Sequence, residues 1–108
     1  MGIIEDTMTE NKYDSPVGRI CYWVHRVSVE DNPSAPWLVF LPGLTADHRL
    51  FAQQIAYFRD FCNCLVWDAP AHGKSRPASL HFTLADMAQY LHHILMCEQI
   101  QQHILLLI

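Results

Sequence analysis

The 108-residue sequence is poor in charged residues, and the charges it has are mostly negative. Charged residues make up 17% of the chain and hydrophobic residues 51%, a balance opposite to that of a disordered, solvating segment. Seven Lys and Arg residues stand against eleven Asp and Glu residues, and no segment concentrates the positive charge. The sequence therefore lacks the electrostatic pattern of a nucleic-acid-binding protein or of a polybasic membrane anchor.

Long hydrophobic runs are also missing. No apolar stretch approaches the roughly 18 residues that a membrane-spanning helix needs. The N-terminus reads MGIIEDTMTE and is acidic, whereas a signal peptide begins with basic residues followed by an apolar stretch. Asp6 occupies the position where an N-myristoylation signal carries Ser or Thr. These features predict no membrane span and a cytoplasmic protein.

Cysteine is scarce, and the four cysteines do not show the regular loop spacing of a disulfide-rich domain. All four cysteines lie in apolar segments, which predicts reduced and mostly buried thiols. Cys62 and Cys64 have no second pair nearby, and His93 and Cys97, one helical turn apart, have no carboxylate partner. We therefore expect neither a disulfide framework nor a metal site.

The glycine patterns of nucleotide-binding loops are absent. The four glycines stand at positions 2, 18, 43 and 73, so they cannot form a G-x-G-x-x-G fingerprint. Gly73-Lys74-Ser75 looks like the end of a phosphate-binding P-loop, but that motif needs a glycine where this sequence has Asp68. Nucleotide binding by either route is excluded.

The sequence that is present begins with a polar segment and a predicted hairpin. Residues 1–12 are mostly polar and acidic, and we expect them to be a flexible N-terminus preceding one domain over residues 13–108. From about residue 8 to residue 26 the pattern is strand-like, and residues 15–18 supply a turn. This pattern predicts a hairpin of antiparallel strands.

Further along the chain, three continuous apolar runs alternate with two segments of helical spacing. Continuous apolar runs are typical of parallel strands buried on both faces. Asp47 is a candidate cap for the first helix, and Thr83 with Asp86 predicts a capping box for the second. The predicted order is strand 37–41, helix 49–58, strand 62–67, helix 84–95 and strand 103–108.

This succession of strands and helices predicts an α/β fold with a mostly parallel sheet and an antiparallel N-terminal hairpin. In a sheet wound in one direction, both crossover helices lie on the same face. We therefore expect the opposite face to be largely bare and the last strand to present an unpaired edge.

Two loops of this pattern resemble those of the α/β-hydrolase fold family. Val39-Phe40-Leu41-Pro42-Gly43-Leu44 is similar to the family's oxyanion strand and loop, and Trp67-Asp68-Ala69-Pro70-Ala71-His72-Gly73-Lys74-Ser75 is similar to its D-x-x-G-H-G-x-S loop. The capped helix from Thr83 and the strand 104–108 stand where the family has the helix and strand that lead into the nucleophile elbow. The resemblance covers residues 13–108 and implies a three-layer sandwich, incomplete in this span.

The resemblance also implies a site. The backbone N–H of Leu44 would supply half of an oxyanion hole, and the hydroxyl of Thr45 is a further candidate for the same site. Pro42 replaces the histidine of many members, and Ala71 replaces a glycine of the second loop. In the family, G-x-S-x-G follows the strand that ends here at Ile108, so the nucleophile, acid and histidine are expected outside this span.

Other polar residues are expected to serve the fold. By the same resemblance, His72 and Ser75 shape the turn of the second loop, and Asp68 accepts the hydrogen bonds that close it. Five further histidines have no visible nucleophile partner and are expected on the surface or on helix faces: His48, His81, His92, His93 and His103.

Taken together, the resemblance implies part of a hydrolase of small ester, thioester or related acyl substrates, working through a Ser nucleophile without a cofactor. Residues 1–108 alone are expected to be inactive and to need the remainder of the fold in cis or in trans. Two alternatives stay open. An Asp nucleophile would make the parent an epoxide hydrolase or dehalogenase, although Leu44-Thr45-Ala46 lacks the proline that those relatives usually carry. The chain could otherwise be a short non-catalytic member of the fold that associates with a partner.

Overall fold

An N-terminal hairpin forms one edge of the sheet. The computed structural model describes residues 2–43 and 45–108 and contains strands β1 (Thr9–Ser15) and β2 (Gly18–His25). The two strands pair antiparallel, from Thr9 opposite Val24 to Ser15 opposite Gly18. Gly18 adopts a φ of 138°, a backbone conformation that only glycine enters readily. The predicted hairpin and its turn are confirmed.

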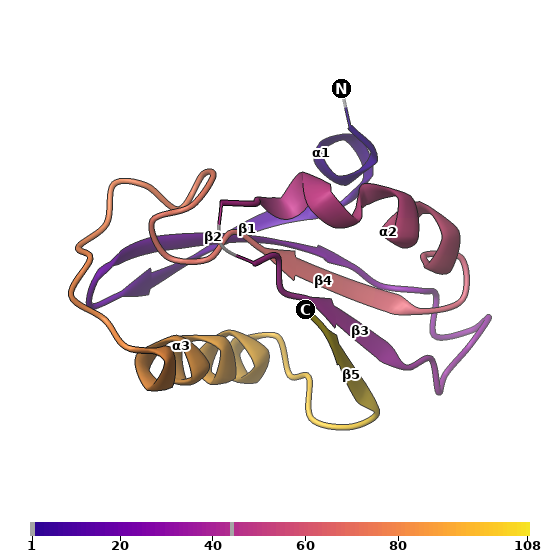
Figure 1. Ribbon diagram of the computed structural model, residues 1–108. Coiled ribbons are helices and arrows are strands. Elements are labelled where there is room, and N and C mark those ends of the chain that lie inside the picture. The colour runs from indigo at the N-terminus through magenta and orange to yellow at the C-terminus, as the bar shows by residue number, and fades with distance from the viewer. Residues whose placement is uncertain (1, 44) are drawn as a thin grey trace.

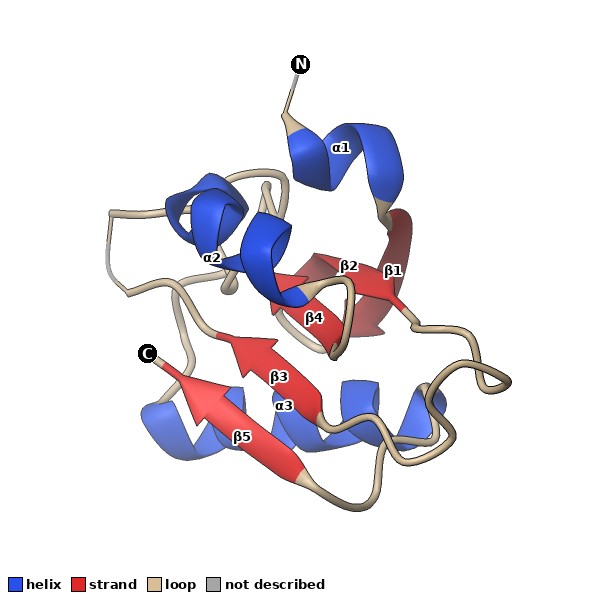
Figure 2. Cartoon of the chain, turned by 90° about the vertical axis from the view of Figure 1, so that its right-hand side faces the viewer, coloured by secondary structure: helices blue, strands red, loops and turns tan. Residues whose placement is uncertain are grey.

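Three parallel strands follow, β3 (Trp37–Phe40), β4 (Asn63–Trp67) and β5 (Ile104–Leu107). The strand order is β1-β2-β4-β3-β5 (Figure 2). β3 pairs in parallel with both β4 and β5, while β2 joins the hairpin to β4 in antiparallel orientation. The α/β class, with a parallel part and an antiparallel hairpin, is therefore confirmed.

The two crossover helices lie on opposite faces of this sheet (Figure 1). Helix α2 (Ala52–Phe58) leads from β3 to β4, and helix α3 (Leu84–Cys97) leads from β4 to β5. Because β3 lies between β4 and β5, the chain winds first to one side of β3 and then to the other. Crossovers of one hand in opposite directions cover opposite faces. The expectation of two helices on one face was wrong because it assumed a single winding direction.

Alternate strand residues supply two separate apolar cores. In β3, Trp37 and Val39 belong to the core that includes α3, and Leu38 and Phe40 belong to the core that includes α2. All four side chains are buried. A strand with helices on both faces needs apolar residues at every position, which explains its continuous apolar run.

Most of residues 3–12, which fall within the expected flexible N-terminus of residues 1–12, lie in a short helix and a strand. Residues Ile3–Thr7 form the short helix α1, and β1 begins at Thr9. Ile4 is 1% exposed and packs in the core that includes α2. One deeply buried aliphatic side chain anchors this helix, and the polar composition of the segment conceals that anchor.

The predicted helix caps are present. Asp47 accepts a hydrogen bond from the Arg49 N–H at the start of the 3-10 helix η1 (His48–Phe51), which leads into α2. Thr83 and Asp86 form the capping box of α3, with each side chain accepting from the other residue's backbone N–H. No helix of the described residues could cross a bilayer, since even α3 has only 14 residues.

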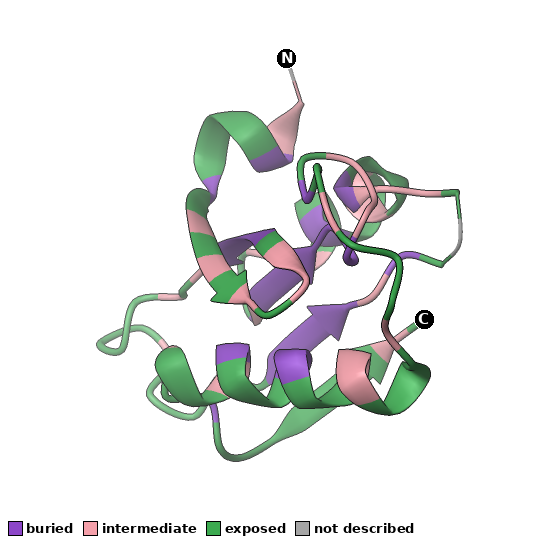
Figure 3. Cartoon of the chain, turned by 90° about the vertical axis from the view of Figure 1, so that its left-hand side faces the viewer, coloured by how far each residue is buried: buried purple, intermediate pink, exposed green. Residues whose placement is uncertain are grey.

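Strand β5 is exposed, although its apolar sequence predicted a buried strand (Figure 3). Leu105 is 59% exposed, Leu106 48% and Ile108 90%. Within the part of the chain that the structure describes, β5 pairs with β3 alone and no helix covers its outer edge. The predicted unpaired edge is therefore present, and the predicted burial is not.

Candidate functional site

The candidate site lies at the edge of the sheet where the three parallel strands end. The loop over residues 41–47 follows β3, and the loop over residues 68–83 follows β4. Ligands of open parallel sheets bind beyond the carboxyl ends of the strands, where such loops meet. Two cavities open at this edge.

The larger cavity is an apolar pocket of about 500 Å³ between α3 and the strand ends. Gly43 from the first loop, His72 from the second loop and Ile108 after β5 all line it. Most of the remaining lining is aliphatic or aromatic. The ends of β3 and β5 therefore share one apolar space.

The smaller cavity is a polar cleft of about 240 Å³ lined by Thr45, Asp47, His72 and Arg76 among others. Thr45 is exposed and has a φ of 66°, a left-handed conformation that non-glycine residues seldom adopt. Thr45, predicted as a site residue, thus lies at the cavity edge. Leu44, the predicted oxyanion donor, lies outside the described residues.

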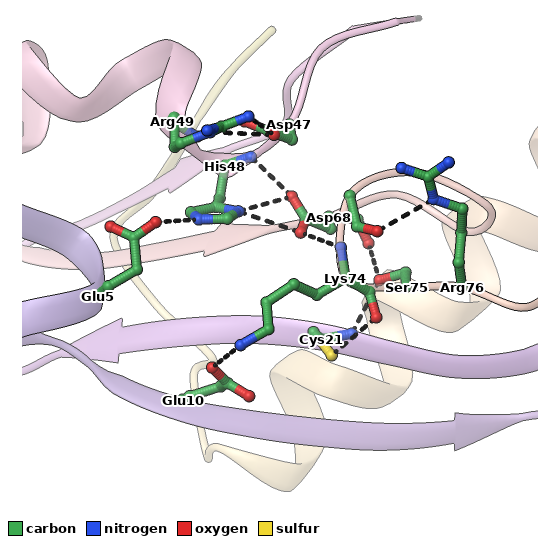
Figure 4. A network of polar contacts seen from close by, with 11 residues as sticks. Glu5, Glu10, Cys21, Asp47, His48, Arg49, Asp68, Lys74, Ser75 and Arg76 are labelled. Carbon is green, nitrogen blue, oxygen red and sulfur yellow. Dashed lines mark hydrogen bonds and ion pairs between the residues drawn. The ribbon is translucent and has the colours of Figure 1, made fainter. Parts of the chain in front are cut away.

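A buried carboxylate, Asp68, joins the two loops (Figure 4). It accepts hydrogen bonds from the backbone N–H of His48 at 2.6 Å and of Lys74 at 2.8 Å. The Ser75 hydroxyl donates to the Asp68 carbonyl at 2.6 Å and accepts from the Cys21 N–H at 2.9 Å. Asp68 and Ser75 therefore close the second loop, as expected, and tie it to the first loop and to β2.

His48 is buried, and its expected place on the surface or on a helix face was wrong. Its Nδ1 lies 3.0 and 3.1 Å from the two Asp68 carboxylate oxygens, and its Nε2 lies 2.6 Å from Glu5 Oε2. The ring stacks on Trp23 with 4.0 Å between ring centroids. Burial lowers the pKa of His48, but the hydrogen bonds and charges of Asp68 and Glu5 outweigh it and raise that pKa above 6.5.

The proximity of Asp68 and His48 could have been predicted from the sequence. Asp68 and His48 belong to loops that follow neighbouring parallel strands, and such loops lie side by side at one sheet edge. Glu5 had no comparable signal, because it reaches the site only through the unforeseen helix α1.

Five more histidines, His72 among them, were expected to serve the fold. His72 donates its Nδ1–H to the Pro70 carbonyl at 3.0 Å and so supports the turn. Ala71, in place of the family's glycine, takes a φ of 71° at this turn. Four further histidines are exposed: His81, His92, His93 and His103.

The cysteines are free thiols, as predicted, with Cys97 exposed and the other three buried. Burial raises the pKa of Cys64 to about 12, so this thiol stays protonated and unreactive. Among the described residues, no group of three His, Cys, Asp or Glu side chains could hold a metal ion.

No protein-family model and no curated protein matches this sequence, whereas several solved structures match its fold. An α/β hydrolase from Novosphingobium aromaticivorans superposes with a TM-score of 0.78 at 20% identity, over 92% of this chain and 34% of that one. The N-acyl homoserine lactonase AidH, complexed with N-hexanoyl homoserine, has a TM-score of 0.75 at 17% identity, over 93% and 35%. A haloalkane dehalogenase from Bradyrhizobium elkani has a TM-score of 0.74 at 17% identity, over 92% and 32%.

The chain thus spans about a third of the length of the solved structures that it matches. At identities of 17–20%, this similarity establishes the fold alone. The matched proteins themselves differ in what they act on. The strand order, the two crossover helices and the loops at the carboxyl edge all agree with this likeness. The chain therefore forms part of an α/β-hydrolase fold.

Proposed function

We propose that the chain is part of a hydrolase that acts on small ester, thioester or related acyl substrates through a Ser nucleophile outside this span. The observation that carries the proposal is that Gly43 and Ile108 line one pocket at the carboxyl edge. In the α/β-hydrolase family the nucleophile follows the strand equivalent to β5. A nucleophile directly after Ile108 would therefore stand beside the loop over residues 41–47.

In this proposal the loop supplies electrostatic stabilisation rather than a reacting side chain. The nucleophile adds to the acyl carbon, and the electron pair of the carbonyl bond moves onto its oxygen. The backbone N–H of Leu44 and that of the residue after the nucleophile would bind this oxyanion. Thr45, which lines the adjoining polar cleft, is a further donor candidate. The mechanism forms and hydrolyses an acyl-enzyme and calls for no cofactor.

Two other readings of the same fold lead to different experimental results. The likeness to a haloalkane dehalogenase keeps an Asp nucleophile open, which would form an alkyl-enzyme ester instead of an acyl-enzyme. The exposed apolar face of β5 supports a non-catalytic chain that associates with a partner. In each case the rest of the fold, in cis or in trans, would cover that face.

The proposal is tested by the hydrolysis of p-nitrophenyl esters and acyl thioesters. We expect turnover by the protein in which residues 1–108 are joined to the rest of the fold, and none above background by residues 1–108 alone. Dehalogenation without ester hydrolysis would indicate the Asp nucleophile. Inactivity of the complete protein towards both substrate classes would support the non-catalytic alternative.

The oxyanion role is tested at Leu44 with a matched pair of variants. Leu44→Pro removes the backbone N–H and is expected to lower kcat by about 10²-fold, with a smaller change in KM. Leu44→Ala keeps the N–H and should retain most of the turnover. Equal losses in both variants would assign Leu44 a packing role and move the oxyanion hole elsewhere.

A further inference from the structure

The imidazole of His48 lies between two carboxylates that come from distant parts of the chain. Glu5 belongs to α1 and Asp68 to the loop after β4, and each faces a different ring nitrogen of His48 (Figure 4). The His48 side chain is 6% exposed, the Asp68 side chain 0% and the Glu5 side chain 32%. The contact therefore bridges the N-terminal helix and the carboxyl edge of the sheet.

With Glu5 and Asp68 both ionised, this geometry is fully satisfied only by a doubly protonated imidazole. An ionised carboxylate only accepts hydrogen bonds, and a neutral imidazole has one N–H donor and one acceptor nitrogen. Here one carboxylate faces each ring nitrogen. In a neutral ring, the unprotonated nitrogen would therefore face a carboxylate oxygen, and both atoms are acceptors. The stacking of the ring on Trp23, with centroids 4.0 Å apart, also favours the cation, because an aromatic face attracts positive charge.

Helix α1 depends on such contacts for its position. A helix of five residues has no stability of its own in water. Burial of Ile4, the Glu5–His48 pair and a contact between Thr7 and Arg59 hold it against the fold. Loss of the Glu5 contact therefore weakens the docking of α1 without removing its apolar anchor.

We propose that Glu5, His48 and Asp68 form a proton-dependent clamp that fastens α1 to the carboxyl edge of the sheet, closed when His48 carries both ring protons and loosened when it carries one. The clamp opens at its Glu5 end. Asp68 is wholly buried and keeps the remaining Nδ1–H as its partner, whereas the Glu5 carboxylate reaches solvent.

The surrounding charges do not substitute for His48. Arg49 is paired with Asp47 at 2.7 Å, and Lys74 with Glu10 at 2.8 Å. The titratable groups around His48, element by element, are Glu5 on α1, Glu10 on β1, Cys21 on β2, Asp47 and Arg49 at η1, and Asp68 and Lys74 after β4. Burial raises the pKa of Cys21, so that thiol is neutral over the relevant range.

The pH range of the clamp follows from the direction of two shifts. The pKa of His48 is raised above 6.5. The stabilisation that protonated His48 gives to the docking of α1 is therefore complete below pH 6.5 and is lost as the pH rises through the raised pKa. The hydrogen bond with His48 lowers the pKa of Glu5 below 4.5. The stabilisation that ionised Glu5 gives to the docking of α1 is therefore complete above pH 4.5 and is lost as the pH falls through the lowered pKa. The clamp is closed between these limits and loosens as the pH rises through the raised pKa of His48.

The clamp is tested by hydrogen exchange of the N-terminal peptide, measured by mass spectrometry on the protein that carries this chain. After correction for base catalysis of exchange, we expect α1 to exchange about tenfold faster above the pH at which the His48 ring titrates than below it. The midpoint of this change should coincide with the titration of the His48 ring followed by NMR. No pH dependence, or a midpoint away from that titration, would overturn the clamp.

A matched pair of variants isolates the Glu5 carboxylate. In Glu5→Gln the amide offers both an acceptor and donors, so it pairs with Nε2 in either protonation state. We expect α1 to stay docked and its exchange to lose the pH dependence. Asp14→Asn removes a carboxylate that pairs with Arg19 and does not touch His48, and it should keep the wild-type profile. An unchanged pH profile in Glu5→Gln would also refute the proposal.

Discussion

At the scale of single residues, Gly73 approaches the Asp68 carboxylate too closely for any side chain. A Cβ at position 73 would lie 2.2 Å from Asp68 Oδ2, and the backbone there has a φ of 48°. Gly73→Ala is therefore expected to destabilise the fold by at least about 2 kcal/mol, through left-handed strain and displacement of Asp68. Urea unfolding measures this as a lower midpoint at an unchanged m-value.

Gly43→Ala is the control for this prediction. A Cβ at Gly43 would meet no atom within 4 Å among the described residues. Its effect on stability should stay within about 0.5 kcal/mol. Equal destabilisation by the two substitutions would mean that the contact with Asp68 contributes nothing beyond the loss of a glycine.

At the scale of elements, α3 starts at a capping box that ties up two backbone N–H groups. The Thr83 hydroxyl accepts from the Asp86 N–H at 3.1 Å, and Asp86 accepts from the Thr83 N–H at 2.9 Å. Thr83→Ala removes the first bond and should cost about 1 kcal/mol in the free energy of unfolding. Thr83→Ser keeps the hydroxyl and should recover most of this loss. Thermal unfolding of both variants tests the prediction, and equal midpoints would argue against the cap.

At the scale of the whole molecule, the exposed face of β5 predicts self-association. A polypeptide of residues 1–108 alone presents Leu105 at 59% and Leu106 at 48% exposure on an unpaired strand, which is a template for pairing. We expect it to sediment as dimers or larger species at micromolar concentration. Leu105→Lys should shift it towards monomer, while Leu50→Lys, at an equally exposed position on η1, should not. A monodisperse, folded monomer of the unmodified chain would contradict this prediction.

Local patterns in the sequence determined most of the elements. The turn at residues 15–18, the apolar run of β3 and the Thr83 capping box each depend on neighbours in the chain, and each is present as predicted. The α/β-hydrolase fold that the solved structures share was anticipated from the resemblance of the two loops to that family's motifs. Such features can be predicted because propensity, capping and periodicity act over a few residues.

Only the tertiary structure decided the features that join distant segments. The order of β4, β3 and β5 reverses the winding and puts α2 and α3 on opposite faces, and nothing in a linear strand–helix pattern specifies that reversal. His48 looked like a surface residue because both of its partners, Glu5 and Asp68, are more than a helix length away in sequence. Burial of β5 likewise depends on what packs against its outer edge. The apolar sequence of this strand shows that burial would be favourable, but it does not show that a neighbour is present to bury it.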